Sequence, residues 1–354
     1  MKIVVTGGAG FVGSNLAIFL NEKISNCEIV CMDNLKRRGS ELNIPVLKSS
    51  GIEFIHGDIR NPEDLSTIES ADFIIDASAE ASVLAGIQSP VYPLINTNFN
   101  GTIHLLELAK KLNSRFIFLS TSRVYPVQAL NNINWKEEST RFSIEEKQSI
   151  GGVSAKGISE EFPLKGSRSF YGSSKLASEL FIEEYTAYGG LKAIVNRCGV
   201  IAGPGQMGKV DQGVLTLWVA RHFWKKELSY IGFSGSGKQV RDILHIDDLK
   251  ELILRQIVNF EKCSGQLFNI GGGKENSISL AELTSICQSV TGNKTVIAKI
   301  EENREADIRT YITDNSRISD RLDWNPAKSV QATVEDIFSW LAANESTLKP
   351  ILGQ

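Results

Sequence analysis

A chain of 354 residues is long enough for two domains and can bury about 75% of the surface that it exposes when unfolded. Hydrophobic residues at 42% and charged residues at 22% are typical of a globular protein and exclude a disordered one. With 38 basic and 41 acidic residues the net charge is -3, which is too small to attract a polyanion, so we expect neither a nucleic-acid nor a membrane partner.

The cysteines and the start of the chain indicate a cellular location. Cys27, Cys31, Cys198, Cys263 and Cys287 show no paired spacing and only four histidines accompany them, so we predict neither a disulfide framework nor a metal site. Buried free thiols fit a reducing compartment. The chain begins without a charged and apolar leader and has no run of about 18 apolar residues. We therefore expect a cytoplasmic protein.

The first 120 residues alternate short apolar runs with stretches of helical period, which is typical of parallel strands joined by crossover helices. Strands are predicted at 3–6, 28–33, 53–56, 73–76 and 116–119, each apolar on both faces, as a covered parallel sheet requires. Helices are expected from residues 10 and 102, with inward side chains from Val12, Leu16 and Phe19 and from Leu105, Leu106 and Leu108. The pattern predicts an α/β fold with a doubly wound parallel sheet.

The later chain is mixed in character. Residues 126–168 lose their periodicity and are polar, charged and glycine-containing, so we expect a long surface excursion there. The further predicted elements are a helix over 171–187 with Leu176, Leu180 and Phe181 inward, a strand over 193–197, a helix over 213–226 with Leu217, Trp218 and Phe223 inward, and a helix opened by a capping box at Ser279.

A glycine-rich loop directly follows the first predicted strand. Gly7, Gly10 and Gly13 stand three residues apart and lead into a helix. Glycine permits the tight turn and lets backbone amides approach a pyrophosphate at the helix N-terminus, where unpaired donors favour negative charge. Asp33 ends the second strand twenty residues further on, where a carboxylate accepts the ribose hydroxyls. The combination predicts a dinucleotide site in a sheet of the Rossmann type.

The acidic residues also bear on the choice of cofactor. A carboxylate at Asp33 repels the 2'-phosphate of NADP, so we predict NAD. The basic residues 36–38 follow closely and suit a phosphate, which leaves NADP as the alternative. Asp58, after the third strand, is a candidate for the adenine end of the cofactor, or else a capping or turn aspartate.

Tyr171 and Lys175 have the spacing that places both side chains on one face of a helix. Tyr188 and Lys192 share this spacing, but two glycines between them should break the helix. A tyrosine acting as a base near neutrality needs its pKa lowered by about three units, or about 4 kcal/mol. We expect Lys175, a helix N-terminus and the positive nicotinamide ring of the bound cofactor to lower the pKa of Tyr171 together. A third group is expected where strand five ends, in the segment Ser120-Thr121-Ser122.

These residues, in this order, resemble the extended short-chain dehydrogenase/reductases that act on nucleotide sugars, over nearly the whole chain. The resemblance is closest to the CDP-paratose (CDP-tyvelose) 2-epimerases. It rests on the segments 33–39, 56–61, 211–213, 237–242 and 268–272. The likeness implies that Thr121 orients a sugar hydroxyl, that Tyr171 is the acid/base, and that Lys175 holds the nicotinamide ribose.

The resemblance also implies binding residues and an assembly. The expected cofactor-binding residues are Gly7, Gly10, Phe11, Val12, Gly13, Asp33, Asn34, Asp58, Ile59, Ala77, Ala79, Asn98 and Lys175, and the expected substrate-binding residues are Glu80, Arg123, Gln212, Arg241 and Arg304. Arg241 and Arg304 fit positions where arginines grip the nucleotide diphosphate. The alternative for both, and for Arg309, is a surface salt bridge. A homo-oligomer, dimer or tetramer, is expected.

No linker rich in proline or serine divides the chain, so we expect two interleaved lobes. We predict a dinucleotide-binding domain over 1–190, to which a strand and a helix near 240–260 return. Residues 191–354 are expected to form mainly a smaller, mixed α/β lobe that binds the nucleotide sugar. A run at 232–239 nearly spells a phosphate-binding P-loop, but Gln239 replaces the hydroxyl residue that would bind magnesium.

Departures from the family pattern narrow the expected reaction. Dehydratases of the family carry an Asp-Glu pair after the threonine and uronate decarboxylases a Glu, whereas this chain has Ser122 and Arg123. The 2-epimerases usually have Asn-Lys there. Glu80 stands where relatives have a neutral residue and is either a second acid/base or a cap. Pro126 and Val200 also depart from the family pattern, so we expect a distinctive sugar pocket.

The favoured activity is a redox-neutral epimerisation at carbon 2 of a CDP-deoxyhexose, through a keto-sugar and with NAD retained. The alternatives are a UDP- or GDP-hexose 4-epimerase, a nucleotide-sugar dehydratase or reductase, and a dinucleotide-binding protein without catalysis. The last alternative predicts a damaged acid/base pair, whereas Tyr171 and Lys175 are intact.

Overall fold

The computed structural model describes residues 1–87, 89–208 and 212–353. It divides into two compact units, and each is built from separate stretches of the chain. The first unit comprises Met1–Val124, Phe170–Arg197 and Lys250–Phe268, and the second comprises Tyr125–Ser169, Cys198–Leu249 and Asn269–Gln354. The division differs from the expected one, because 125–169 belongs to the second unit and the segment that returns to the first is 250–268.

The first unit is built on a sheet with the strand order β14-β10-β5-β4-β1-β2-β3. The pairs β1–β2, β1–β4, β2–β3 and β4–β5 are parallel. The predicted doubly wound sheet is confirmed. The strands are β1 (Lys2–Thr6), β2 (Glu28–Asp33), β3 (Glu53–His56), β4 (Phe73–Asp76), β5 (Arg115–Thr121), β10 (Ala193–Cys198) and β14 (Gln266–Ile270). The helices between them are α1 (Phe11–Lys23), η1 (Ser40–Asn43), α2 (Ile44–Ser49), α3 (Pro62–Leu65), α4 (Tyr92–Ile95), η2 (Asn96–Asn100), α5 (Gly101–Leu112), η3 (Ser122–Val124), α7 (Phe170–Ala187), α9 (Ile246–Val258) and α10 (Phe260–Cys263).

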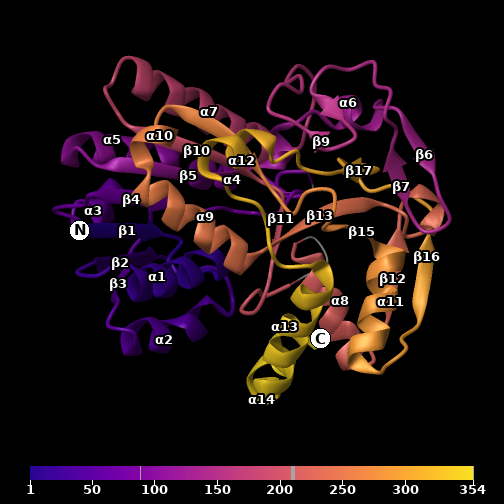
Figure 1. Ribbon diagram of the computed structural model, residues 1–354. Helices are drawn as coiled ribbons and strands as arrows, with labels where there is room; N and C mark the ends of the chain where they lie inside the picture. The colour runs from indigo at the N-terminus through magenta and orange to yellow at the C-terminus, as the bar shows by residue number, and fades with distance from the viewer. Residues whose placement is uncertain (88, 209–211, 354) are drawn as a thin grey trace. The chain divides into compact units, whose positions relative to one another are not determined.

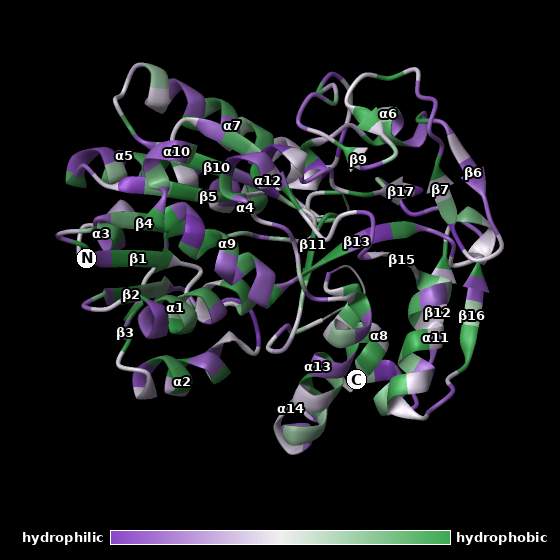
Figure 2. Cartoon of the chain, in the orientation of Figure 1, coloured by the Kyte–Doolittle hydropathy of each residue, from purple (hydrophilic) through white to green (hydrophobic). Residues whose placement is uncertain are grey.

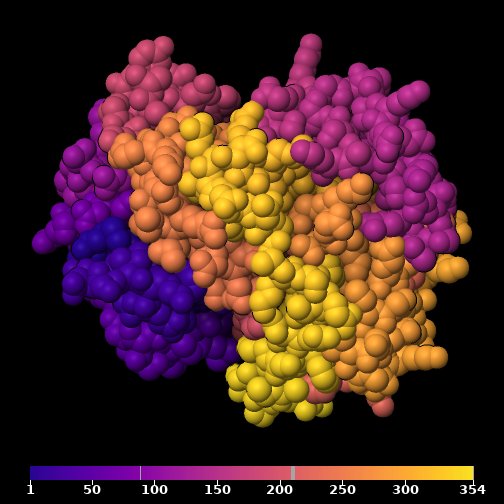
Figure 3. Space-filling view, viewed as in Figure 1, coloured from indigo at the N-terminus to yellow at the C-terminus, as the bar shows by residue number. Residues whose placement is uncertain are grey.

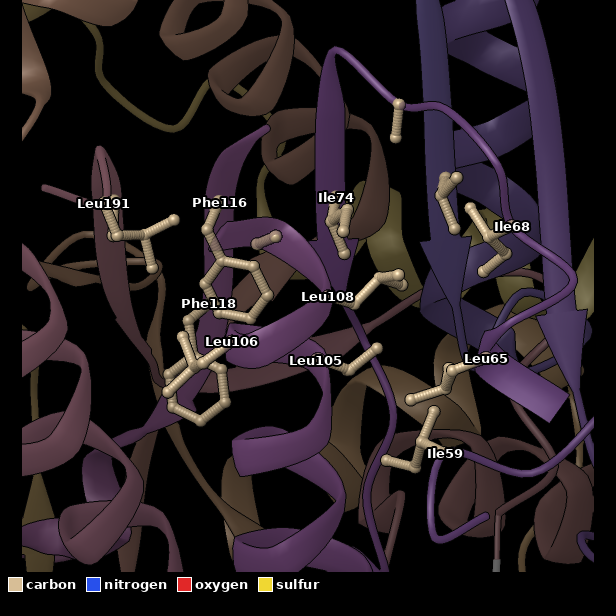
Figure 4. Packing of buried hydrophobic residues seen from close by; sticks show 14 of the residues in the cluster. Ile59, Leu65, Ile68, Ile74, Leu105, Leu106, Leu108, Phe116, Phe118 and Leu191 are labelled. Atoms are coloured by element: carbon tan, nitrogen blue, oxygen red, sulfur yellow. The ribbon is translucent and has the colours of Figure 1, made fainter. Parts of the chain in front are cut away.

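A hydrophobic core joins one face of this sheet to α3, α5 and α7. Ile74 and Phe116 of the strands belong to one buried cluster with Leu65 of α3 and Leu105 of α5, whose side chains are labelled in Figure 4. Burying each such side chain contributes about 1.5–3 kcal/mol. Figure 2 shows the matching hydrophobic colour along β1 and β4. The exception is β3, whose ends are exposed because it is the edge strand, so the prediction that it is apolar on both faces is wrong.

Helices α1 and α9 pack together elsewhere in the first unit. The ammonium of Lys250 on α9 lies 5.2 Å from the ring centre of Phe19 on α1. Figure 1 shows the two helices side by side, and in the space-filling view the orange atoms of α9 lie against the indigo N-terminal residues. Leu16 and Leu20 of α1 are fully buried, so α1 is fixed on the sheet with its N-terminus at the glycine loop.

Helix α7 presents a polar face to the interior of the first unit. Its buried residues are Gly172, Ser174, Lys175, Ser178, Glu179 and Ile182. The prediction that Leu180 and Phe181 face inward is wrong, since these side chains are 55% and 45% exposed. The reason is that buried polar groups of α7 have specific partners. The Ser178 hydroxyl, for example, donates to the Asn98 carbonyl at 2.9 Å.

Residues 125–169 form short elements of the second unit. They comprise α6 (Val127–Asn131), β6 (Trp135–Glu137), β7 (Phe142–Ile144), β8 (Val153–Ser154) and β9 (Gly157–Ile158). β6 and β7 form one antiparallel pair, and β8 and β9 form another. Most of 126–168 is exposed or half-buried, as expected for a surface excursion, but Phe142, Ile158 and Phe162 are buried. Their wide spacing in a polar sequence gives no periodic signal, although each anchors its segment.

The remainder of the second unit combines a mixed sheet with helices. β13 pairs in parallel with β11 and β17 and antiparallel with β15, while β12 pairs with β16. The predicted capping box at Ser279 is confirmed. No helix of the described ranges has the length and hydropathy to cross a membrane. The bounds are β11 (Val200–Ala202), α8 (Val214–Phe223), β12 (Leu228–Ile231), η4 (Phe233–Gly235), β13 (Val240–His245), β15 (Ser277–Ser279), α11 (Leu280–Thr291), β16 (Ile297–Ile300), β17 (Thr310–Tyr311), α12 (Ser316–Leu322), α13 (Val330–Ala343) and α14 (Glu345–Leu352).

Candidate functional site

The glycine loop is a tight turn with no room for side chains. The Gly10 amide donates to the Gly7 carbonyl at 3.0 Å. A Cβ on Gly7 would lie 2.7 Å from the Ala77 carbonyl oxygen, and one on Gly13 would lie 2.2 Å from the Gly7 oxygen. Gly10 caps α1 without a side-chain hydrogen bond, and the next residues are Phe11 and Val12. The backbone amides of this first turn are therefore suited to bind a pyrophosphate.

Asp33 lies beside that loop. Its two carboxylate oxygens accept the amide protons of Ala9 at 3.1 Å and Leu35 at 2.8 Å. Burial raises the pKa of Asp33, while hydrogen bonds from backbone amides oppose the shift. Each oxygen keeps a further lone pair, which suits a carboxylate that binds a ribose diol. Together with the loop, this geometry fits the dinucleotide that the sequence predicts.

The carboxylate of Asp58 accepts hydrogen bonds from two neighbouring side chains. Its carboxylate accepts from Asn34 Nδ2 at 2.9 Å and from both Nε and Nη2 of Arg60, the latter at 2.5 Å. These bonds hold the pKa of Asp58 below its ordinary range. The neighbouring Ile59 side chain belongs to the core, where a Cβ on Gly101 would come within 2.5 Å of it. The carboxylate of Asp58 therefore stabilises its own turn through Asn34 and Arg60, as the capping or turn alternative predicts.

The segment after β4 is held by an asparagine of η2. Asn98 Oδ1 accepts from the Glu80 amide at 2.8 Å, and Asn98 Nδ2 donates to the Glu80 carbonyl at 3.1 Å. The same Nδ2 lies 3.2 Å from the Ser174 hydroxyl on α7. The Glu80 carboxylate is 3.6 Å from the Lys36 ammonium. Asn98 is therefore placed to shape the segment that contains Ala77, Ala79 and Glu80.

Thr121 ends β5, and Tyr171 and Lys175 lie one turn apart at the start of α7. Thr121 is buried, and its hydroxyl accepts from the Arg123 amide at 3.2 Å. Lys175 is 1% exposed, with its Nζ 3.9 Å from the ring centre of Phe118. η3, which follows Thr121, packs against α7. The structure thus brings both segments into contact within the first unit.

The second tyrosine and lysine pair has no shared helix. α7 ends at Ala187, so Tyr188 and Lys192 both follow it. Tyr188 is 87% exposed. The prediction that this spacing is an accident of the sequence is confirmed.

A buried network beside Thr121 was not predicted. The Ser120 hydroxyl donates to the Glu179 carboxylate, which also accepts from Arg197 Nε at 3.0 Å and Nη2 at 2.7 Å. All three side chains are buried. The available signal in the sequence was spacing, since Glu179 is four residues after Lys175 and so lies on the same helix face.

The expected substrate arginines lie in the second unit. Arg241 on β13 donates to Asp307 Oδ1 at 3.2 Å and to the carbonyls of Val240 and Ile308, each at 2.8 Å. Arg304 is half-buried three residues before Asp307. Gln212 is also half-buried, whereas Asp211 of the predicted motif lies outside the described residues. The structure therefore brings Arg241 together with the segment that contains Arg304.

One group of metal-ligand residue types also lies in the second unit. Atoms of His245, Asp247 and Asp336 come within 4.8 Å of one another. The Lys328 ammonium is 3.0 Å from Asp336 and 3.8 Å from Asp247. A cation of the protein therefore already balances these carboxylates.

Comparison with known proteins agrees with this geometry. The family model for the NAD dependent epimerase/dehydratase family matches residues 3–271. A CDP-paratose 2-epimerase of Salmonella typhi is 32% identical, over 97% of this chain and 100% of that protein. A UDP-glucose 4-epimerase of Erwinia amylovora is 27% identical, over 97% and 98%.

Two solved structures are similar in fold along their whole length. The UDP-glucose 4-epimerase of Thermotoga maritima, with UDP-glucose, has a TM-score of 0.76 at 25% identity and covers 98% of this chain and 100% of its own. The dTDP-glucose 4,6-dehydratase of Bacillus anthracis, with NAD, has a TM-score of 0.77 at 27% identity and covers 99% of both. The predicted resemblance, enzyme class and cofactor are confirmed: the chain belongs to the NAD-dependent epimerase/dehydratase family, whose members here act on nucleotide sugars.

Proposed function

We propose that the protein is an NAD-dependent 2-epimerase of a CDP-linked deoxyhexose. The observation that carries this proposal is the buried Lys175 one helical turn after Tyr171, on a helix that packs against the segment following Thr121. The similarity to a CDP-paratose 2-epimerase, over 97% of this chain and 100% of that protein, supports the choice of sugar nucleotide. Ser122 and Arg123 support it further, because neither is the carboxylic acid that dehydration needs.

The residues have separate tasks in this reaction. The bound dinucleotide supplies a hydride acceptor that is restored within each cycle. Tyr171 accepts the proton of the sugar hydroxyl at carbon 2 as a keto-sugar forms, and returns it after the keto-sugar has turned. Thr121 holds the same oxygen by a hydrogen bond. No proton or electron is gained or lost over the cycle, so the reaction needs no added reductant.

Lys175 tunes Tyr171 through its charge. An ammonium that is 1% exposed acts in a medium of lower effective dielectric than water, so its field at the neighbouring phenol is stronger. A positive charge lowers the pKa of a nearby tyrosine. The ring of Phe118 below the ammonium restrains Lys175 and contributes a cation–π contact.

Product analysis tests the proposal. The purified enzyme is incubated with CDP-paratose, UDP-glucose and GDP-mannose separately, without added cofactor, and the sugars are analysed by NMR. We expect inversion at carbon 2 of the CDP-sugar and no change in the others. Inversion of UDP-glucose or GDP-mannose at carbon 4, with CDP-paratose unchanged, would overturn the assignment in favour of a 4-epimerase.

We also propose that the enzyme forms homo-oligomers through α7 and α4. Leu180 and Phe181 of α7 and Tyr92 and Ile95 of α4 are exposed apolar side chains. The rings of Phe181 on α7 and Phe99 on η2, which directly follows α4, meet edge to face with centres 5.3 Å apart. α4 also contacts α7, so these exposed side chains lie on one apolar surface. A second copy of this chain is the occupant that the family likeness favours, and a symmetric dimer buries the same surface on both copies.

The proposed location is the cytoplasm. Cys31, Cys198, Cys263 and Cys287 are buried thiols outside disulfides, which suit a reducing compartment. Imaging of the full chain fused to a fluorescent protein tests this, and export of the fusion would contradict it.

A further inference from the structure

Arg309 lies in a box of three aromatic rings in the second unit. Its guanidinium carbon is 4.1 Å from the ring centre of Trp135, 5.1 Å from Phe233 and 5.6 Å from Phe142. The rings support one another, since Phe142 contacts Trp135 at 5.2 Å and Phe233 at 6.0 Å between centres. We call these three residues the aromatic box. It holds the planar guanidinium in one orientation.

The charge of Arg309 has no carboxylate partner among the described residues. The sequence left a surface salt bridge open for this arginine, and no described acidic oxygen lies within 4 Å of it. Its Nε is buried without an acceptor. Its Nη1 makes one long contact, of 3.4 Å, with the Asn131 carbonyl. Burial lowers the pKa of Arg309, as expected for a cation without a nearby anion.

An aromatic box satisfies only the faces of a guanidinium. Its five N–H groups point outward in the plane, and cation–π contacts leave them without acceptors. A half-buried donor edge of this kind is expected to have a ligand that offers adjacent acceptor atoms, because unfilled donors are costly in a desolvated place.

Arg309 is tied to the two arginines that the sequence assigns to the diphosphate. The Val240 amide donates to the Arg309 carbonyl at 3.0 Å, next to Arg241 in the chain. Arg241 binds Asp307 and the Ile308 carbonyl, immediately before Arg309. The Asn303 side chain accepts the amide of Phe233 at 2.7 Å, which joins the aromatic box to the segment that contains Arg304.

We propose that Arg309 is a nucleotide-binding residue, whose guanidinium donates two parallel N–H hydrogen bonds (its fork) to two adjacent acceptor atoms of the sugar nucleotide. The inference rests on the proposed function. Two atom pairs have this chemistry: two oxygens of a phosphate, or O2 and N3 of cytosine. Uracil presents an N–H at position 3, so it accepts only one of the two bonds. If the base is the ligand, Arg309 discriminates CDP from UDP. If the phosphate is the ligand, Arg309 is a third cation at the diphosphate, beside Arg241 and Arg304.

Calorimetric titration of the NAD-loaded enzyme with CDP, UDP and pyrophosphate tests this. Arg309→Met is expected to weaken CDP binding about tenfold or more, the effect of losing charged hydrogen bonds. Arg321→Met, at an exposed arginine of α12, is the matched control and should leave every affinity unchanged. A loss confined to CDP assigns the cytosine edge, and an equal loss for all three ligands assigns the phosphate.

Arg309→Lys separates a loss of nucleotide binding from a folding defect. Lysine keeps the positive charge and the aromatic contact but lacks the fork, so we expect an unchanged melting temperature with weakened CDP binding. If Arg309→Met and Arg309→Lys both bind CDP and UDP as tightly as the parent enzyme, Arg309 only packs against the aromatic box and the inference is wrong. If the parent enzyme binds pyrophosphate but neither nucleotide, the proposed function itself fails.

Discussion

Arg197 and Glu179 form an ion pair of 2.7 Å in which the side chains are only 5% and 4% exposed. Arg197 belongs to β10 and Glu179 to α7, one turn after Lys175. Glu179 also accepts from Ser120, the residue before Thr121. The pair therefore fixes α7 to the sheet beneath the proposed acid/base residues.

Replacing Arg197 tests how much this ion pair contributes to the free energy of unfolding. Arg197→Met leaves the Glu179 carboxylate buried without its cation, and we expect the free energy of unfolding to fall by about 3–5 kcal/mol. Urea unfolding of the NAD-saturated protein measures the change. Lys192→Met, which breaks an exposed pair with Glu261, is the control and should have little effect. Equal effects of the two variants would show that burial adds nothing.

Gly13 is predicted to be irreplaceable for cofactor binding. Gly13→Ala places a Cβ 2.2 Å from the Gly7 oxygen, so the loop must open and its amides no longer converge. Gly151→Ala is the control, because no atom of the described residues lies within 4 Å of the Cβ it would add. The NAD content of the purified proteins, measured after acid release, should fall at least tenfold in the first variant and stay unchanged in the second. Full NAD occupancy in Gly13→Ala would contradict the assigned loop.

The sequence predicted the first unit well and the second unit poorly, for a physical reason. The strands β1, β2, β4 and β5 are buried on both sides, so their apolar runs identify them directly. The buried face of α7 is polar instead, and hydrophobic periodicity placed Phe181 on the wrong side. Residues 125–169 owe their order to isolated anchors such as Phe142 and to long-range hydrogen bonds, which local patterns do not reveal.

The positions of some site residues could be predicted from the sequence, but the side-chain partners of the site residues could not. Asp33 and Gly13 follow a spacing that the chain must keep along one strand and one helix, so they were predictable. The contact of Asn98 with the backbone of Glu80 joins residues 18 apart through a π-helical turn. The aromatic box of Arg309 joins segments more than 160 residues apart. Such pairs depend on tertiary packing alone.

Asp58 should make stability depend on pH. Arg60 and Asn34 hold its pKa below the ordinary value, and an unfolded aspartate titrates near pH 3.9. Since the native pKa is lowered, the stabilisation is present above about pH 4 and is lost as the pH falls further. Asp58→Asn should therefore lower the melting temperature at pH 7 more than at pH 3. The exposed Asp320→Asn serves as control, and equal effects of Asp58→Asn at both pH values would refute the argument.

A charge on the apolar surface of α7 should dissociate the proposed oligomer. We expect the parent enzyme to elute as a dimer or larger in size-exclusion chromatography with light scattering, and Phe181→Glu to elute as a monomer. Val258→Glu, at a more exposed apolar residue of α9, should not change the mass. A monomeric parent enzyme at micromolar concentration would exclude the oligomer.

Turnover by Tyr171→Phe tests the central claim most directly. The variant loses only the phenolic hydroxyl, so NAD should remain bound at the parent level while the epimerisation rate falls by at least about 100-fold. Tyr188→Phe, at the exposed tyrosine of the second Tyr-x-x-x-Lys spacing, should keep full activity. Rates are followed by NMR of the CDP-sugar, and bound NAD is assayed in the same samples. A Tyr171→Phe enzyme that turns over at the parent rate would contradict the assignment of Tyr171 as the acid/base residue.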